Sequence, residues 1–127
     1  MTSIIKVDEI QNKAGSTSLA ANKLPDMLSG SAKVWVNFNG TGTIATRESL
    51  NVSGLTDSGT GDYSVSLTNS MSSSDYSGSA AGATSGNVGF DDAVGNTASS
   101  LSLGGFTASG SRVDTVTVVG ICHGDLA

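Results

Sequence analysis

Short segments in which apolar and polar residues alternate are the feature that most limits how this chain can fold. In residues 33–39, KVWVNFN, the apolar Val34, Val36 and Phe38 share one parity, and Trp35 has the other. Successive side chains of a β-strand point to opposite faces, so this pattern predicts a half-buried strand with Trp35 on its second face. No amphipathic helix of ten residues is predicted after residue 30, which disfavours a parallel α/β sheet.

Further strands are predicted at residues 50–55, 63–67, 87–90, 101–103 and 113–121. The last of these is the strongest, because it is rich in β-branched residues. Clusters of Gly, Ser, Asn and Asp at residues 39–43, 57–62, 72–85 and 104–111 predict turns and loops. The sequence therefore predicts an all-β fold over residues 31–127, an antiparallel β-sandwich or barrel, of which a small β-sandwich is preferred. Its expected core residues are Trp35, Phe38, Tyr63, Leu67, Val116 and Val118.

The first thirty residues are expected to form an N-terminal arm. Ile4, Ile5, Val7 and Ile10 give this segment a short apolar pattern that suits a strand or an extended chain. A brief helix is expected at residues 25–28, with Pro25 in its first turn. Because the segment holds few large apolar side chains, it cannot form a core alone, and we expect it to dock on a partner.

Small polar residues dominate the composition and limit how much apolar surface one copy can bury. The 127 residues include 22 Ser, 13 Thr and 17 Gly. Burial of apolar surface contributes roughly 25 cal/mol per Å², so the core of a single copy is expected to be thin. Such a chain is expected to gain stability from association, and a homo-oligomer is predicted.

The net charge of −5 is unevenly placed along the chain. After residue 48, Arg112 is the only basic residue, against seven Asp residues. An acidic body with few aromatic side chains should repel nucleic-acid phosphates, so no nucleic acid partner is expected. No stretch approaches the roughly 20 apolar residues of a membrane span, and no membrane insertion is expected.

Three polar clusters have residues that ligand sites use, but each is better explained as a turn. Gly40 and Gly42 lack the spacing of a phosphate-binding loop, whereas Asn39-Gly40 suits a tight hairpin turn. Residues 57–62 lack the ordered ligands of an EF-hand calcium loop. Asp91-Asp92 is interpreted as a solvated turn.

Cys122 and His123 are the only cysteine and histidine. Neighbours on an extended chain point to opposite faces, so these two residues are not expected to form a nucleophile–base pair. A zinc site in one chain is not expected from one Cys and one His. A surface position for His123 is favoured over an ion shared by three copies around an axis. No catalytic residue, cofactor or metal site is predicted.

Residues 33–67 resemble a module found in bacteriophage tail-fibre and related virion proteins. The module begins W-V-N-F-N-G-T-G-T and continues, after an Arg, with N-V-S-x-[IL]-T-D-x-G-T-G-D-Y. The matching residues here are Trp35, Val36, Asn37, Phe38, Asn39, Gly40, Thr41, Gly42, Arg47, Asn51, Val52, Thr56, Asp57, Gly59, Thr60, Gly61, Asp62 and Tyr63. Residues 3–12 are similar to the I-K-V-D-x-I-Q-N start of many phage structural proteins. Residues 68–111 depart from the pattern, and Ser72 stands where the family has Pro.

The resemblance implies a virion structural protein, most simply a short tail fibre or fibre adaptor, with no catalytic residues to carry over. It implies docking on tail, baseplate or capsid proteins through Ile4, Ile5, Val7 and Ile10, and assembly as a homotrimer. Trp35 and His123 are the expected subunit-interface residues. Exposed loops would contact a host surface glycan or protein. A capsid decoration or head-fibre protein is the alternative; a free carbohydrate-binding module and an enzyme rank lower.

Overall fold

The computed structural model describes residues 9–11, 18–20, 30–83, 87–91 and 95–127. The chain divides into two compact units, Met1–Ser31 and Ala32–Ala127. In the first unit, β1 (Glu9–Gln11) pairs antiparallel with β2 (Ser18–Ala20), and Ile10 and Leu19 are partners in the ladder. The brief helix predicted at residues 25–28 lies outside the described residues.

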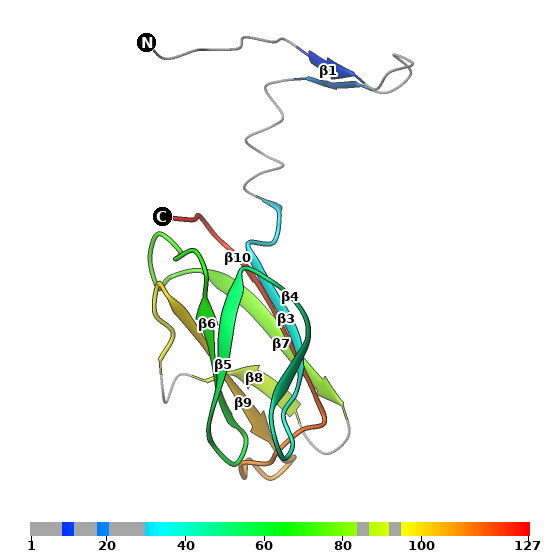
Figure 1. Cartoon of the computed structure of the whole chain (residues 1–127), viewed down its shortest axis with the longest axis vertical. Helices are drawn as coiled ribbons and strands as arrows, with labels where there is room; N and C mark the ends of the chain where they lie inside the picture. Colours follow the sequence, from blue (N-terminus) through cyan, green and yellow to red (C-terminus); the bar gives the residue numbers. More distant parts are fainter. Residues whose placement is uncertain (1–8, 12–17, 21–29, 84–86, 92–94) are drawn as a thin grey trace. The chain divides into compact units, whose positions relative to one another are not determined.

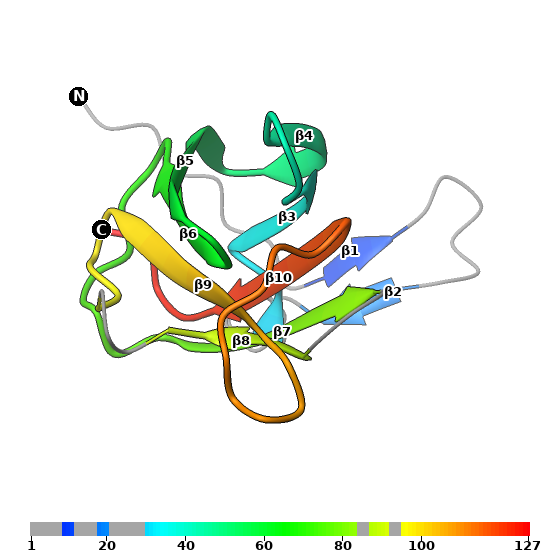
Figure 2. The same cartoon turned by 90° about the horizontal axis from the view of Figure 1, so that it is seen from below.

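The second unit, hereafter the body, consists of two four-stranded antiparallel sheets (Figures 1 and 2), which confirms the predicted all-β sandwich. The first sheet has the order β4 (Ala45–Leu50), β3 (Val34–Asn39), β10 (Thr117–His123), β7 (Ser77–Ala83). The second sheet has the order β5 (Val52–Gly59), β6 (Asp62–Leu67), β9 (Ser100–Phe106), β8 (Asn87–Phe90). The chain passes from one sheet to the other four times. The edge strands β4 and β5 are consecutive in the chain and lie in different sheets, and the same holds for the edge strands β7 and β8.

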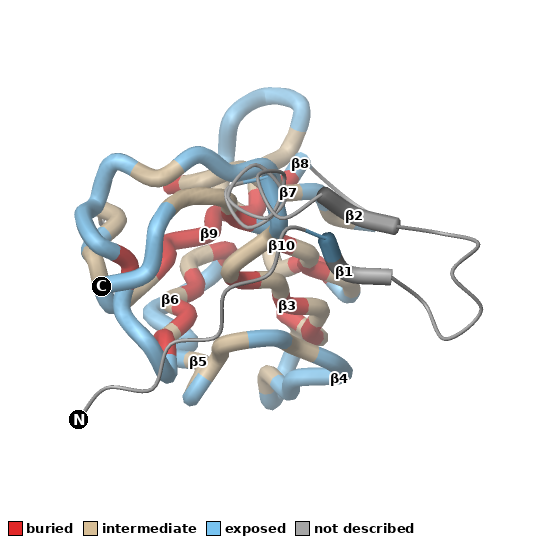
Figure 3. Tube along the Cα trace, turned by 90° about the horizontal axis from the view of Figure 1, so that it is seen from above, coloured by how far each residue is buried: buried red, intermediate tan, exposed pale blue. Residues whose placement is uncertain are grey.

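The core lies between the two sheets, and buried residues alternate with less buried ones along β3, β6 and β10 (Figure 3). Phe38 of β3 and Tyr63 of β6 meet edge to face across the layers, with ring centroids 5.3 Å apart and an interplanar angle of 79°. The buried apolar residues are Val34, Val36, Phe38, Tyr63, Val65, Leu67, Met71, Val88, Leu101, Leu103, Val118 and Cys122. Four of the six predicted core residues are in this set.

Val116 and Trp35 were wrongly assigned to the core. The last strand begins at Thr117, later than the predicted start, and Val116 in the loop before it is 47% exposed. Trp35 is half-buried on the outer face of β3, because the opposite parity of that strand already fills the core. The second-face position predicted for Trp35 is thus correct.

A strand made only of Gly, Ala and Ser forms one edge of the first sheet, where a loop had been predicted. β7 has the sequence SGSAAGA and pairs with β10 along its whole length. A Cβ added to Gly78 would overlap the ring of Phe90, and one added to Gly82 would overlap the side chain of Val88. Glycine in this strand therefore allows β8 to approach β7 closely, and propensity alone does not predict it.

The predicted strand at residues 50–55 is two strands separated by a corner at Asn51. β4 ends at Leu50 and β5 begins at Val52 in the other sheet, and Asn51 adopts a φ of 61°. Asn tolerates this left-handed conformation better than most residues do. Its side chain accepts from the Asn69 amide (2.7 Å) and donates to the Asn69 carbonyl (3.0 Å), which anchors the corner to the segment after β6.

We expect Gly78→Ala to destabilise the body, because the new methyl group would lie 2.8 Å from the Ile121 carbonyl as well as against Phe90. Overpacking of this kind costs typically about 1–3 kcal/mol, measurable as a lower urea midpoint. Gly54→Ala in β5 is the matched control, because no atom lies within 4 Å of its added Cβ. Equal stability of the two variants would contradict this account of β7.

Candidate interaction surface

The outer face of the first sheet carries a band of apolar side chains. Leu50, Trp35 and Ile121 are in register on β4, β3 and β10, and Val119 and Ala81 lie in the next outward row on β10 and β7. Leu50 is 46% and Ile121 37% exposed. We call these five residues the Trp35 face. Together they form a contiguous solvent-accessible apolar surface, a feature that marks interaction sites on soluble proteins.

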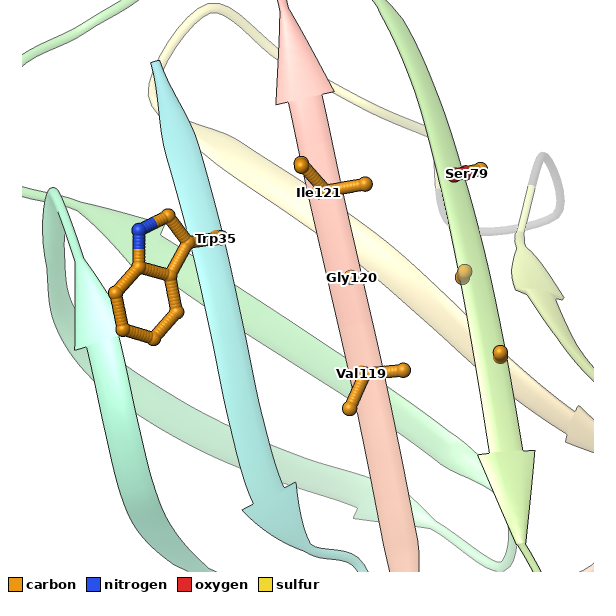
Figure 4. A pocket seen from close by; sticks show the side chains of 7 residues that line it. Trp35, Ser79, Val119, Gly120 and Ile121 are labelled. Carbon is orange, nitrogen blue, oxygen red and sulfur yellow. The ribbon is translucent and has the colours of Figure 1, made fainter. Parts of the chain in front are cut away.

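A shallow depression of about 270 Å³ lies on this face (Figure 4). It is lined by Trp35, Ser79, Ala80, Ala81, Val119, Gly120 and Ile121. Trp35 bounds one side and Ser79 of β7 the other, with Ile121 and Val119 between them. The volume is below the roughly 300–1,000 Å³ of most small-molecule pockets, and the lining holds no charged side chain. The depression therefore suits apolar side chains of a partner surface.

The outer face of the second sheet has the opposite character. Ser64 of β6 has Thr56 and Ser102 as its cross-strand partners, and Ser66 is paired with Ser100. Ser102 is buried under the loop before β9, where its amide donates to Asn96 Oδ1 (2.9 Å) and its hydroxyl to the Gly95 carbonyl (3.1 Å). The outer face of the second sheet thus carries small polar side chains, whereas that of the first carries large apolar ones beside Asn37, Glu48 and Ser79.

Arg47, which matches the fibre module, links three strands at the rim of the Trp35 face. Its guanidinium donates to the Phe38 carbonyl (3.1 Å), the Thr117 hydroxyl (3.2 Å) and the Val116 carbonyl (2.8 Å). These contacts follow the register shift between Asn37 and Phe38, where the extra residue on β4 is Arg47 itself. The five donors of a guanidinium suit this role, so the residue is explained by the fold.

Gly40, in the glycine-rich turn after β3, helps to hold the sandwich together. The Tyr63 hydroxyl donates to the Gly40 carbonyl (2.7 Å) and accepts from the Thr115 amide (3.2 Å), while the Gly40 amide donates to the Thr115 carbonyl (3.0 Å). A Cβ on residue 40 would lie 2.7 Å from that hydroxyl. Burial raises the pKa of the Tyr63 phenol above its ordinary value. We call Tyr63, Gly40 and Thr115 the tyrosine latch.

The loop at residues 57–62 is a hairpin end tied to the same region. Asp57 Oδ1 accepts from the Gly59 amide (3.0 Å), and Gly61, with a φ of 63°, donates to Asp114 Oδ1 (2.7 Å). Among the described residues, no group of three His, Cys, Asp or Glu side chains is placed to hold a metal ion. The carboxylates of Asp57 and Asp114 are instead explained by the backbone amides that donate to them.

The expectation of a solvated turn at Asp91-Asp92 is wrong for Asp91, which is 4% exposed. Its carboxylate forms an ion pair with Arg112. Arg112 also donates to the Gly61 carbonyl (3.0 Å) and stacks over the ring of Phe106 at 5.1 Å. Removing one member of a buried pair is costly, so this cluster fixes the loop before β10. Asp92 lies outside the described residues.

Cys122 and His123 point to opposite faces of β10, as the alternation predicts. Cys122 is fully buried, and His123 is half-exposed on the same outer face as Trp35. Burial raises the pKa of the Cys122 thiol to about 11, so the thiol is protonated and weakly nucleophilic at neutral pH. The two predicted interface residues, Trp35 and His123, thus share one face of one sheet.

The predicted docking residues of the arm cannot be compared with the structure. Ile4, Ile5 and Val7 lie outside the described residues, and for Ile10 only the backbone pairing is described. The described part of the chain has no helix long and apolar enough to cross a membrane. Comparison of the chain with protein-family models, curated proteins and solved structures finds no match.

We expect Tyr63→Phe to lower the free energy of unfolding by about 1–3 kcal/mol, because it leaves the buried Thr115 amide and Gly40 carbonyl without their shared partner. The measurement is a urea unfolding curve. Tyr76→Phe is the control, since the Tyr76 hydroxyl donates one hydrogen bond, to the Ser100 carbonyl (2.8 Å), at a partly exposed position. A smaller loss for Tyr63→Phe than for the control would refute the latch.

Stability is expected to fall between about pH 8.5 and 11. The unfolded Cys122 thiol ionises near pH 8.5, whereas burial holds the folded thiol neutral to about pH 11. Its contribution is therefore fully present below the unfolded pKa and is lost as the pH rises to the folded one. Unfolding free energies measured from pH 7 to 11 should fall less steeply for Cys122→Ala. An identical slope in both proteins would contradict this assignment.

Proposed function

We propose that this chain is a bacteriophage virion structural protein, a short tail fibre or fibre adaptor that functions without catalysis. The observation that carries the proposal is the role of the matched module residues in the fold. Gly40 and Tyr63 form the tyrosine latch with Thr115, Arg47 links three strands, and Gly61 closes a hairpin onto Asp114. The residues among them that match the fibre module are explained by the hydrogen bonds with which they hold the β-body together.

The division of the chain supports the same role. Residues 1–30 are proposed to dock on tail, baseplate or capsid proteins, and the body, with its own core over Ala32–Ala127, is proposed to project from the particle. The body is proposed to assemble as a homotrimer. Host contact, with a surface glycan or protein, is proposed for the exposed loops. β7 lies within the predicted 72–85 loop, and β9 takes the start of the predicted 104–111 loop, so residues 72–76 and 107–111 remain as candidates.

The opposite orientations of Cys122 and His123 favour this structural role over a Cys–His catalytic one. A nucleophile and its base need to lie within hydrogen-bond reach of each other. Here the thiol is in the core, and the imidazole is on the outer face of the sheet.

Deletion of residues 1–30 tests the docking role. We expect the truncated protein to fold, because the body has its own core, and to be absent from purified particles when it replaces the full chain during infection. The fold is checked by circular dichroism and the particles by mass spectrometry. A matched variant keeps the full chain length and replaces only the proposed docking residues, Ile4, Ile5, Val7 and Ile10, by Ser. Normal incorporation of the truncated protein would eliminate the docking role.

Copy number in particles separates a tail location from a shell location. A fibre or adaptor is expected in a few tens of copies or fewer, whereas a capsid decoration protein is expected in hundreds. Quantitative mass spectrometry against the major capsid protein supplies the ratio. Hundreds of copies would replace the tail-fibre proposal by the capsid-decoration alternative, and complete absence from particles would overturn both.

A further inference from the structure

We infer that the Trp35 face is a contact between copies of this chain, in which the large side chains of one copy lie over the small side chains of the next. This inference does not rest on the virion role, because it follows from the register, size and charge of side chains on one sheet.

The face is divided into a ridge and a trough. Trp35 and Leu50 are partners on β3 and β4 and form the ridge. Ser79 and Ala81 on β7 form the trough, beside Ile121 and Val119 on β10. The depression of about 270 Å³ lies between Trp35 and β7 (Figure 4). Large residues thus occupy one half of the sheet and small residues the other.

A second copy is the partner whose shape the face already matches. Rotation by a half turn about an axis parallel to the strands places β4 of one copy over β7 of the other, and β3 over β10. The ridge of each copy then meets the trough of its partner, as an isologous contact requires. A ring of three places the ridge of each copy on the trough of the next. In both cases the strands stay nearly aligned, which is the common geometry of packed sheets.

The low charge of this face reduces the repulsion between two copies that meet there. Residues 31–127 carry three basic and eight acidic side chains, a net charge of −5, so two bodies repel each other at most orientations. Around the two central strands of the Trp35 face, Glu48 is the one carboxylate in the described registers, and Arg47 lies next to it in sequence. Asp57, Asp62 and Asp114 cluster at the β5–β6 hairpin instead.

The size of the face sets the strength of the contact. Four strands spaced about 4.8 Å apart, each about 20 Å long, cover roughly 400 Å² per copy. A stable pair of proteins buries about 800 Å² on each partner. The contact is therefore expected to be weak, so the fraction of associated protein should rise with protein concentration.

Sedimentation of the full-length protein over a range of concentrations tests the inference with three single variants. Trp35→Ala removes the aromatic side chain of the ridge, and Ala81→Leu fills the exposed trough. Thr56→Leu places the same leucine side chain on the polar outer face of the second sheet. Loss of a central aromatic contact weakens association by roughly thirtyfold or more. We expect such a loss for the first two variants and wild-type association for the third. A wild-type protein that stays monomeric, or association unaffected by Trp35→Ala, would overturn the inference.

Mixing the two weakened variants gives a sharper test. In a mixed complex, the intact ridge of the Ala81→Leu copy meets the intact trough of the Trp35→Ala copy, and the shortened ridge meets the filled trough. Association should therefore recover in the mixture, whereas it stays weak for each variant alone. No recovery would show that ridge and trough do not meet. A stoichiometry of two would keep this face and remove the trimer from the proposed function.

The wild-type protein provides a measurement that is independent of any folding defect in the variants. Trp35 is the only tryptophan and is half-buried in one copy. Its fluorescence emission should shift to shorter wavelength as the protein associates. Emission that stays constant while the mass increases would place the contact elsewhere and overturn the inference.

Discussion

The hydroxyl of Tyr63 is the interaction on which the arrangement of the two sheets most depends. It joins the turn after β3, through the Gly40 carbonyl, to the segment before β10, through the Thr115 amide. The ring of the same residue packs on Phe38 in the core. One side chain of β6 therefore fixes the spacing of the layers and the path of two connections in the other sheet. Glycine at position 40 follows from this contact, because any side chain there would meet the phenol.

The two outer faces of the sandwich differ because the sequence assigns different residues to equivalent positions. Outward positions of the second sheet carry Ser and Thr, whereas those of the first carry Trp35, Leu50, Val119 and Ile121. A small domain needs only one buried layer to fold, so a second apolar layer indicates a further contact.

Alternation allowed the sandwich, four of the six core residues and the outward position of Trp35 to be predicted from the sequence. Three of the wrong predictions, at β7, at Val116 and at residues 50–55, have one physical origin, which is that tertiary contacts overrode local propensity. β7 is a strand without β-branched residues because Phe90 and Val88 need glycine opposite them. Val116 belongs to a loop because Thr115 bonds to the turn at Gly40. The strand at residues 50–55 is broken because Asn51 adopts a left-handed conformation. The Arg112–Asp91 pair carried no local signal, since its partners are far apart in sequence.

The ends of the body lie next to each other. The Lys33 amide donates to the Cys122 carbonyl (2.9 Å), so the start of the first body strand adjoins the end of the last. The residues after β10 fold onto the segment at residues 70–72, with the Ala127 amide bonded to the Ser70 carbonyl (2.9 Å). A domain whose entry and exit points are neighbours can be inserted into a surface loop of another protein without stretching the host. The body is therefore suited to use as a transplantable module, and its order of strands is suited to circular permutation.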